Sequence, residues 1–168
     1  MNDPVLITYA TRYGSTQEVA EQVATTLREG GHTVDLQRAR DVRTLEGYGA
    51  VVLGAALYMY RWHRDARRFL SRHRQALVDR PVAVFALGPV EDKEEQFQDA
   101  RRQLDKALAK FPWFTPVTVA VFGGKFDPAR LPFPINRFAG SEPASDIRDW
   151  ESIRAWAKGL PEKLQGKE

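Results

Sequence analysis

Residues 5–16 read VLITYATRYGST, and their pattern indicates the class of fold. Its first half is almost wholly apolar, aromatic or β-branched, which is typical of a strand buried on both faces of a parallel sheet. Its second half is polar and contains Gly14, and apolar residues then recur at helical spacing from Val19 to Leu27. The stretch therefore predicts a strand, a tight loop and a helix in direct succession.

The same unit recurs along the rest of the chain. Further strands are expected at 32–36, 50–55, 81–87 and 117–122, and further helices at 62–77, at 94–110 and from about Asp146, where Asp149 suggests a capping box. Prolines interrupt residues 125–143, where we expect an irregular loop. Because strands alternate with helices, we predict one α/β domain over residues 1–168, a three-layer α/β/α sandwich around a five-stranded parallel sheet.

The composition limits which chemistry the chain can perform. None of its 168 residues is cysteine, which excludes thiol nucleophiles, thiolate metal sites and disulfides and fits a reducing cytoplasm. Redox chemistry would therefore need a cofactor. No paired carboxylates, metal-spaced histidines or serine triad stand out, so no catalytic side chain is assigned. No stretch approaches the roughly 20 apolar residues of a membrane helix, and we expect a cytoplasmic protein.

Positive charge is concentrated in residues 61–80. The net charge of the chain is +3, yet this segment holds seven arginines against only Asp65 and Asp79. Such a run fits a solvated helix face, or a patch that meets an acidic protein, an anionic membrane surface or nucleic acid. Nucleic acid is disfavoured because the aromatic residues lie beside a buried strand end and are not interleaved along an exposed groove. We expect the helix Arg61–Arg80 to contact an acidic protein or an anionic membrane, to which the protein would be peripheral.

The loop that follows the first strand has the features of an anion site. In sheets of this class, ligands bind beyond the carboxyl ends of the strands, where the strand order reverses. Thr11, Ser15 and Thr16 offer hydroxyls there, Gly14 allows a close turn, and the helix N-terminus offers free amides. A simple helix cap explains one hydroxyl but not three. The loop lacks the P-loop lysine and the Gly-x-Gly-x-x-Gly motif, which leaves a mononucleotide phosphate.

Two other loops are expected to join this site. The loop 55–62 places aromatic side chains directly after a buried strand, where Tyr58 or Tyr60 could contact a planar ring or pack on its own domain. The loop 87–92 has no aromatic residue, so its backbone groups are expected to face the polar edge of such a ring. His63 and His73 lie in the basic segment and fit a solvent-facing or a functional position equally well.

These residues resemble the flavodoxin family, and more closely its flavodoxin-domain branch that includes the menaquinone-dependent protoporphyrinogen oxidase. The most specific pieces are Thr11–Thr16, Gly54-Ala55-Ala56 and Asp149-Trp150-Glu151. The resemblance implies a flavodoxin-like strand order 2-1-3-4-5 and FMN as the cofactor. It implies that the phosphate is bound by Thr11, Arg12, Tyr13, Gly14, Ser15 and Thr16, one side of the isoalloxazine by Ala56, Leu57, Tyr58, Met59 and Tyr60, and its pyrimidine edge by Gly88, Pro89, Val90 and Glu91.

Two functions remain open at this point. The first is an FMN-binding redox protein, either an electron carrier for a redox partner protein or a quinone-linked oxidoreductase of the protoporphyrinogen-oxidase kind. The second is a noncatalytic binding or regulatory module that docks an acidic partner through residues 61–80. A yellow protein that is reconstituted by FMN favours the first function, and a colourless protein that FMN cannot reconstitute favours the second.

Overall fold

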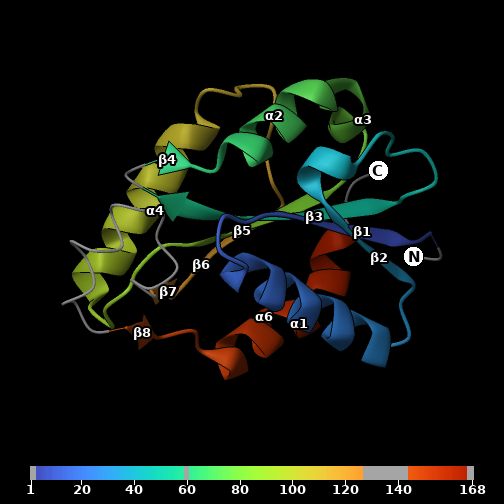
Figure 1. The fold of residues 1–168 in the computed structure, drawn as a ribbon. Helices are drawn as coiled ribbons and strands as arrows, with labels where there is room; N and C mark the ends of the chain where they lie inside the picture. Colours follow the sequence, from blue (N-terminus) through green and yellow to red (C-terminus); the bar gives the residue numbers. More distant parts are fainter. Residues whose placement is uncertain (1–2, 59–60, 127–143, 166–168) are drawn as a thin grey trace.

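The protein forms a parallel sheet that is covered by helices on both faces (Figure 1). The computed structural model describes residues 3–58, 61–126 and 144–165. In spatial order the long strands are β2 (Val34–Arg38), β1 (Val5–Ala10), β3 (Ala50–Tyr58), β5 (Val82–Leu87) and β6 (Thr118–Phe122). All four pairings between these neighbours are parallel. The expected five-stranded sheet and its order 2-1-3-4-5 are therefore confirmed.

The helices divide into two layers, which confirms the three-layer sandwich. One face of the sheet is covered by α1 (Ser15–Glu29) and α6 (Trp150–Leu164). The other face is covered by the 3-10 turn η1 (Ala39–Asp41), α2 (Arg64–Arg72), α3 (Arg74–Val78) and α4 (Glu94–Leu108). Short strands β4 (Arg61–Trp62), β7 (Lys125–Phe126) and β8 (Ser145–Asp146) complete the described elements.

The central strands supply both halves of the core. All six residues of β1 are buried, and successive side chains point to opposite faces of the sheet. Val5 and Ile7 pack in the apolar cluster beneath α1 and α6, whereas Leu6 packs in the cluster beneath α2 and α4. A strand that is buried on both faces needs apolar residues at nearly every position, which is why β1 shows no polar alternation.

The third strand is longer than the sequence predicted. It was expected to end at Ala55 but continues to Tyr58, and β4 pairs with its last residues in the antiparallel direction. The indole nitrogen of Trp62 donates a hydrogen bond to the carbonyl of Ala55 at 3.2 Å, and the His63 amide donates to Ala56 at 3.0 Å. The expected loop over 55–62 is therefore largely a β-hairpin, because these bonds satisfy the extended backbone.

The predicted basic helix is also divided. Residues 62–77 were expected to form one helix, but Trp62 belongs to β4 and the helix is interrupted at His73, between α2 and α3. The His73 ring is buried, packs 4.7 Å from the Phe69 ring and bonds the Val42 carbonyl through Nε2 at 3.2 Å. His73 thus joins the two helices to the loop after η1.

The last helix begins later than predicted. Its N-cap is Asp149, whose carboxylate accepts bonds from the Ser152 amide at 3.1 Å and the Ser152 hydroxyl at 2.7 Å. The expected cap residue Asp146 instead lies in β8, which pairs with β7. Its carboxylate accepts hydrogen bonds from Arg148 and is therefore not available as a helix cap. The irregular loop predicted over 125–143 lies outside the described residues, apart from the two residues of β7.

The buried histidine makes stability depend on pH. Burial lowers the pKa of His73 below its usual value, Arg72 adds to this effect, and the bond to Val42 opposes it. Just below the usual value of about 6.5, the unfolded chain therefore binds more protons than the folded chain, and the free energy of unfolding falls as the pH falls. We expect urea denaturation to show this loss on acidification from neutral pH, at most about 1.4 kcal/mol per pH unit from this residue.

The variant His73→Gln tests this assignment, since a glutamine amide can keep a donor for the Val42 carbonyl but cannot titrate. Its free energy of unfolding should vary less with pH than that of the wild-type protein between neutral pH and about pH 5.5. Identical slopes in the two proteins would show that His73 does not carry the effect.

Candidate functional site

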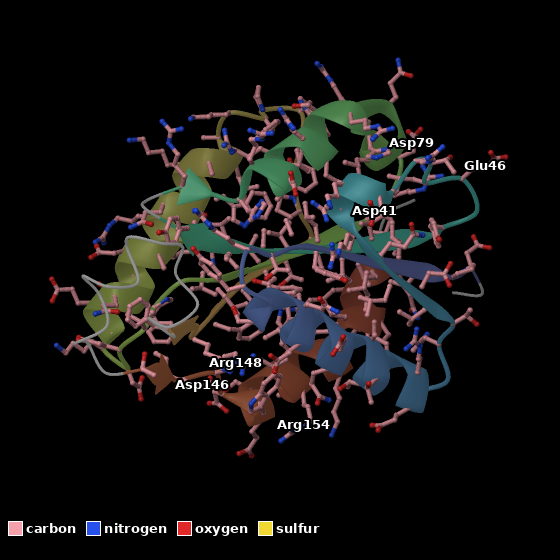
Figure 2. All side chains as sticks on the ribbon, viewed as in Figure 1. Asp41, Glu46, Asp79, Asp146, Arg148 and Arg154 are labelled. Atoms are coloured by element: carbon pink, nitrogen blue, oxygen red, sulfur yellow. The ribbon has the colours of Figure 1, made fainter. Side chains whose placement is uncertain are left out.

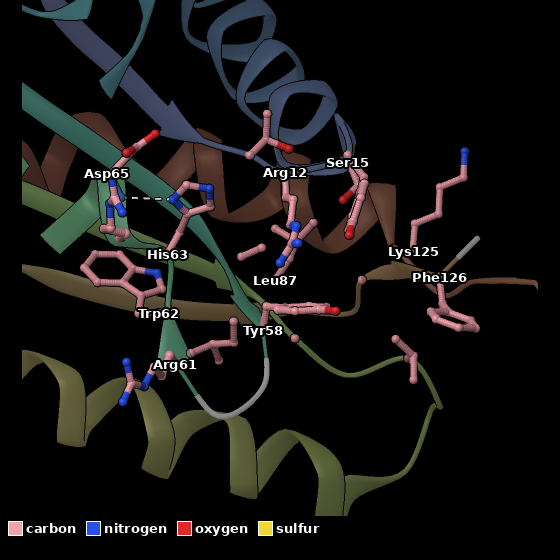
Figure 3. Close-up of a pocket in the computed structure, with 18 of the residues that line it drawn as sticks. Arg12, Ser15, Tyr58, Arg61, Trp62, His63, Asp65, Leu87, Lys125 and Phe126 are labelled. Atoms are coloured by element: carbon pink, nitrogen blue, oxygen red, sulfur yellow. Dashed lines mark hydrogen bonds between the residues drawn. The ribbon is translucent and has the colours of Figure 1, made fainter. Parts of the chain in front are cut away.

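A cavity of about 610 Å³ lies at the carboxyl ends of the central strands (Figure 3). Its wall comes from the loop after β1, the β3–β4 hairpin, the start of α2, the loop after β5 and β7. The chain places β2 on one side of β1 and β3 on the other, so the strand order reverses at this point. Parallel sheets bind ligands at such a position, and the volume is in the usual range for ligand sites.

Nine of the fifteen residues predicted for the site line this cavity. They are Thr11, Arg12, Tyr13, Ser15, Ala56, Leu57, Tyr58, Gly88 and Val90. Gly14, Thr16, Pro89 and Glu91 are described but do not line it, and Met59 and Tyr60 lie outside the described residues. The structure thus brings the three predicted loops together around one space.

The predicted residues that do not line the cavity have other surroundings. Thr16 is fully buried, and its hydroxyl has no hydrogen-bond partner within the described part of the chain. The Pro89 carbonyl accepts a bond from the Gly124 amide at 2.6 Å, which ties the loop after β5 to the end of β6. Glu91 is exposed and forms an ion pair with Lys93 at 2.8 Å, which lowers the pKa of the Glu91 carboxyl.

The loop after β1 has the geometry of an anion site. Gly14 adopts φ +91°, a left-handed conformation that glycine takes without steric cost, and its amide donates to the Thr11 hydroxyl at 2.8 Å. The N-cap residue of α1 is Gly14, which has no side chain to cap the first turn. The amides of that turn and the positive end of the helix dipole are therefore available to an anion, together with the hydroxyls of Thr11 and Ser15.

Aromatic rings form the middle of the cavity wall. Tyr58 is 39% exposed, and the Tyr13 ring meets it edge-on with centroids 6.5 Å apart. The Arg12 guanidinium lies over both rings, 4.8 Å from the Tyr58 centroid and 5.5 Å from the Tyr13 centroid. Burial raises the pKa of Tyr13 above its usual value, so its phenol is neutral at pH 7. This wall offers a planar ligand an aromatic face and a cation.

At the α2 end of the cavity, the sequence predicted Arg61 and Trp62 as part of the loop 55–62 and left the position of His63 open. This end is lined by Arg61, Trp62, His63, Arg64, Asp65 and Arg67. His63 occupies the N-cap position of α2, and its Nδ1 accepts a bond from the Asp65 amide at 3.0 Å. Burial lowers the pKa of His63, and neighbouring arginines lower it further against the opposing charge of Asp65. The imidazole is therefore neutral at pH 7. The sequence signal that could have assigned His63 to the site is its position near the start of the predicted helix 62–77.

Arg148 holds the anion loop against the segment before α6. Its side chain is only 4% exposed and pairs with Asp146 at 2.8 Å and with Glu18 at 3.3 Å. It also donates to the Ser15 carbonyl at 3.3 Å, and Figure 2 shows it next to Asp146 below the start of α1. Sequence reasoning missed this contact because Arg148 and Ser15 are 133 residues apart and no local pattern connects them.

A second hollow, which we call the basic groove, adjoins the cavity. It has a volume of about 800 Å³, and its cations are Arg40, Arg64, Arg67, Arg68, Arg72 and Lys110. Arg64, Asp65 and Arg67 line both spaces. The arginine run predicted at 61–80 therefore does not form a uniform helix face, because part of it lies beside the candidate site.

Two classes of feature are missing from the described residues. None of the helices described here has both the length and the apolar character needed to span a bilayer. Within the same residues, no group of three or more histidine and acidic side chains is placed to hold a metal ion.

Comparisons with known proteins identify related sequences and folds. A family model described as a flavodoxin domain matches residues 6–137. The chain is 30% identical to the protoporphyrinogen IX dehydrogenase [quinone] of Escherichia coli strain K12, an alignment that covers 92% of this chain and 93% of that protein.

Two solved structures share the fold. Flavodoxin 2 of Bacillus cereus has a TM-score of 0.59 and 21% identity, and the match covers 95% of this chain and 99% of that one. The rubredoxin oxygen:oxidoreductase of Desulfovibrio gigas has a TM-score of 0.58 and 17% identity, and the match covers 98% of this chain but 36% of that one. At these identities the two structures bear on the fold alone.

Proposed function

Because the chain belongs to the flavodoxin domain family, we propose that it binds FMN in the cavity and transfers electrons from a reduced substrate to a quinone. The observation that carries this proposal is the uncapped first turn of α1, which opens onto an aromatic cavity at the point where the strand order reverses. FMN consists of a phosphate and a planar ring joined by a short polar chain. Its phosphate matches the helix N-terminus, and its ring matches the aromatic cavity.

The residues present fit the cofactor. Thr11, Ser15 and the first amides of α1 would hold the phosphate, Tyr58 and its strand neighbours would contact the ring, and Gly88 would offer its backbone to the ring edge. Bound FMN would supply reversible electron uptake, which the side chains of a cysteine-free chain do not offer. The surrounding protein would bind the ring, orient it and limit its contact with water.

The donor and acceptor are inferred from the relative. The printed name of the E. coli protein gives protoporphyrinogen IX as its substrate and a quinone as its acceptor. Identity of 30% over nearly the whole of both chains supports the same class of reaction here, with a redox partner protein as the alternative acceptor. If this protein is cytoplasmic and contacts the membrane surface, it has access to both protoporphyrinogen IX and the quinone.

Reconstitution followed by turnover tests this function. The apoprotein should bind one FMN per chain, and the holoprotein should then reduce a soluble quinone such as menadione with protoporphyrinogen IX as the donor. The measurements are flavin absorbance after removal of free FMN and porphyrin fluorescence over time, with unfolded protein as a control for spontaneous oxidation. Failure of the folded protein to retain FMN would overturn the proposal. FMN binding without turnover would overturn the oxidoreductase activity and favour an electron carrier.

The basic groove favours a second candidate function. In the described part of the chain, none of its six cations forms an ion pair with an acidic side chain, so their charge is available to a partner. A noncatalytic module that docks an acidic protein through this groove would need no cofactor. The reconstitution experiment separates the two functions, because such a module would stay colourless in the presence of FMN.

A further inference from the structure

The proposed FMN contacts leave the α2 end of the cavity unassigned. We propose that this end binds the carboxylate groups of an anionic substrate, with His63 and Arg67 as its hydrogen-bond donors. The inference rests on the proposed function, since it concerns the substrate that would meet the bound ring. Its support is the geometry of two donors that are already fixed in position and directed to the same cavity.

His63 is held in one protonation state by the backbone. A backbone amide can only donate, so the Nδ1 atom that accepts from the Asp65 amide is unprotonated and the neutral ring carries its proton on Nε2. No described protein group accepts a bond from that Nε2. Figure 3 shows the His63 ring directed toward Arg12 in the middle of the cavity. The ring therefore presents a fixed N–H donor to a ligand.

Arg67 is held in a comparable way. Its Nε donates to the Trp62 carbonyl at 3.1 Å, and Trp62 is itself buried and bonded to Ala55. The side chain is half-buried and lines the cavity, and no described group bonds its terminal nitrogens. A guanidinium anchored through Nε keeps two parallel N–H groups free, which is the arrangement that binds a carboxylate in a bidentate manner.

The surrounding charge favours an anion at this end. Arg12, Arg61 and Arg64 line the same space, and Asp65 is the acidic side chain that faces them. Glu18, the other carboxylate of the cavity wall, is at the start of α1 and is paired with Arg148. The balance is therefore positive beside His63, and it stays positive where the cavity continues into the basic groove. A substrate larger than the cavity could extend in that direction.

A pair of ligands that differ in charge tests the proposal. Protoporphyrin IX carries two carboxylates and is stable in air, whereas its dimethyl ester is the same macrocycle without negative charge. With the FMN-loaded protein and submicromolar porphyrin, the dissociation constant measured by porphyrin fluorescence should be at least about tenfold lower for the dicarboxylate than for the ester. Equal dissociation constants for the two porphyrins would overturn the proposal.

Two variants locate the effect. Arg67→Gln should raise the dissociation constant of the dicarboxylate about tenfold and leave that of the ester unchanged. His63→Asn should act in the same direction without loss of thermal stability, because asparagine also caps helices but does not reach as far as Nε2. Arg154→Gln removes the same charge from α6, on the opposite face of the sheet, and should change neither constant. Equal effects of Arg67→Gln and Arg154→Gln would show that only net charge matters.

The FMN content of every variant is measured by absorbance. Retention of FMN together with loss of the charge discrimination would confine the failure to this inference. Absence of FMN from the wild-type protein would overturn the proposed function instead. Loss of FMN in His63→Asn alone would overturn the assignment of His63 to the substrate, because it would place this side chain on the cofactor.

Discussion

The double variant Thr11→Val/Ser15→Ala should bind FMN at least about 100-fold more weakly than the wild-type protein. Hydrogen bonds to a charged phosphate contribute about 1.5–3 kcal/mol each, and the variant removes the two hydroxyls that the structure places on the cavity wall. The Thr11 change also removes the acceptor of the Gly14 amide, which loosens the turn. Quenching of FMN fluorescence on titration with apoprotein measures the dissociation constant.

Thr16→Val is the matched control for this experiment. Thr16 stands in the same motif, but its side chain does not line the cavity and its buried hydroxyl has no partner among the described residues. Valine has nearly the same shape, so the variant should keep both FMN affinity and stability. A large loss of FMN in Thr16→Val would show that the loop rearranges around the phosphate and that the sequence-based assignment of all three hydroxyls is correct.

The strands and helices could be predicted because each one has its own apolar pattern within a short stretch of the sequence. A strand buried on both faces has to be apolar throughout, and a helix packed on one side has to repeat its apolar residues at helical spacing, as residues 5–27 do. The position of the candidate site followed from the same pattern, because parallel strands bring their carboxyl ends to one edge of the sheet. The exact strand order came from the resemblance to flavodoxins, since local periodicity does not determine which strands are neighbours.

The rest depended on contacts that no local pattern records. The β3–β4 hairpin is held by hydrogen bonds from Trp62 and His63 to β3. The arginines on either side of these two residues give the segment no apolar strand pattern, so the pairing could not be predicted. Arg148 reaches the anion loop across 133 residues of sequence, so this contact depends on the tertiary fold and not on a local pattern. His63 takes a capping position for which Ser, Thr, Asp and Asn are preferred, so a search for usual capping residues passes over it.

The second large effect is expected at Gly54, in the strand that carries the cavity wall. A Cβ atom built on Gly54 would lie 1.9 Å from Phe85 Cζ, and Phe85 is fully buried between sheet and helix. Gly54→Ala should therefore lower the free energy of unfolding by about 3 kcal/mol, because a buried ring has to move from its packed position. For a chain of this length, that change corresponds to a fall in Tm of roughly 6–12 °C.

Two companion variants establish that the loss comes from this clash. A Cβ atom added to Gly159 in α6 would meet no described atom within 4 Å beyond its chain neighbours and the backbone of its own helix. The same change at Gly159 should therefore raise stability by about 0.5–1 kcal/mol through helix propensity. Phe85→Leu removes the ring atoms that meet the Gly54 Cβ, so the double variant Gly54→Ala/Phe85→Leu should be more stable than the sum of the two single effects predicts. Additive effects in thermal denaturation would mean that Gly54→Ala acts through the backbone of β3. In that case FMN affinity should fall as well, because Ala56, Leu57 and Tyr58 continue the same strand into the cavity wall.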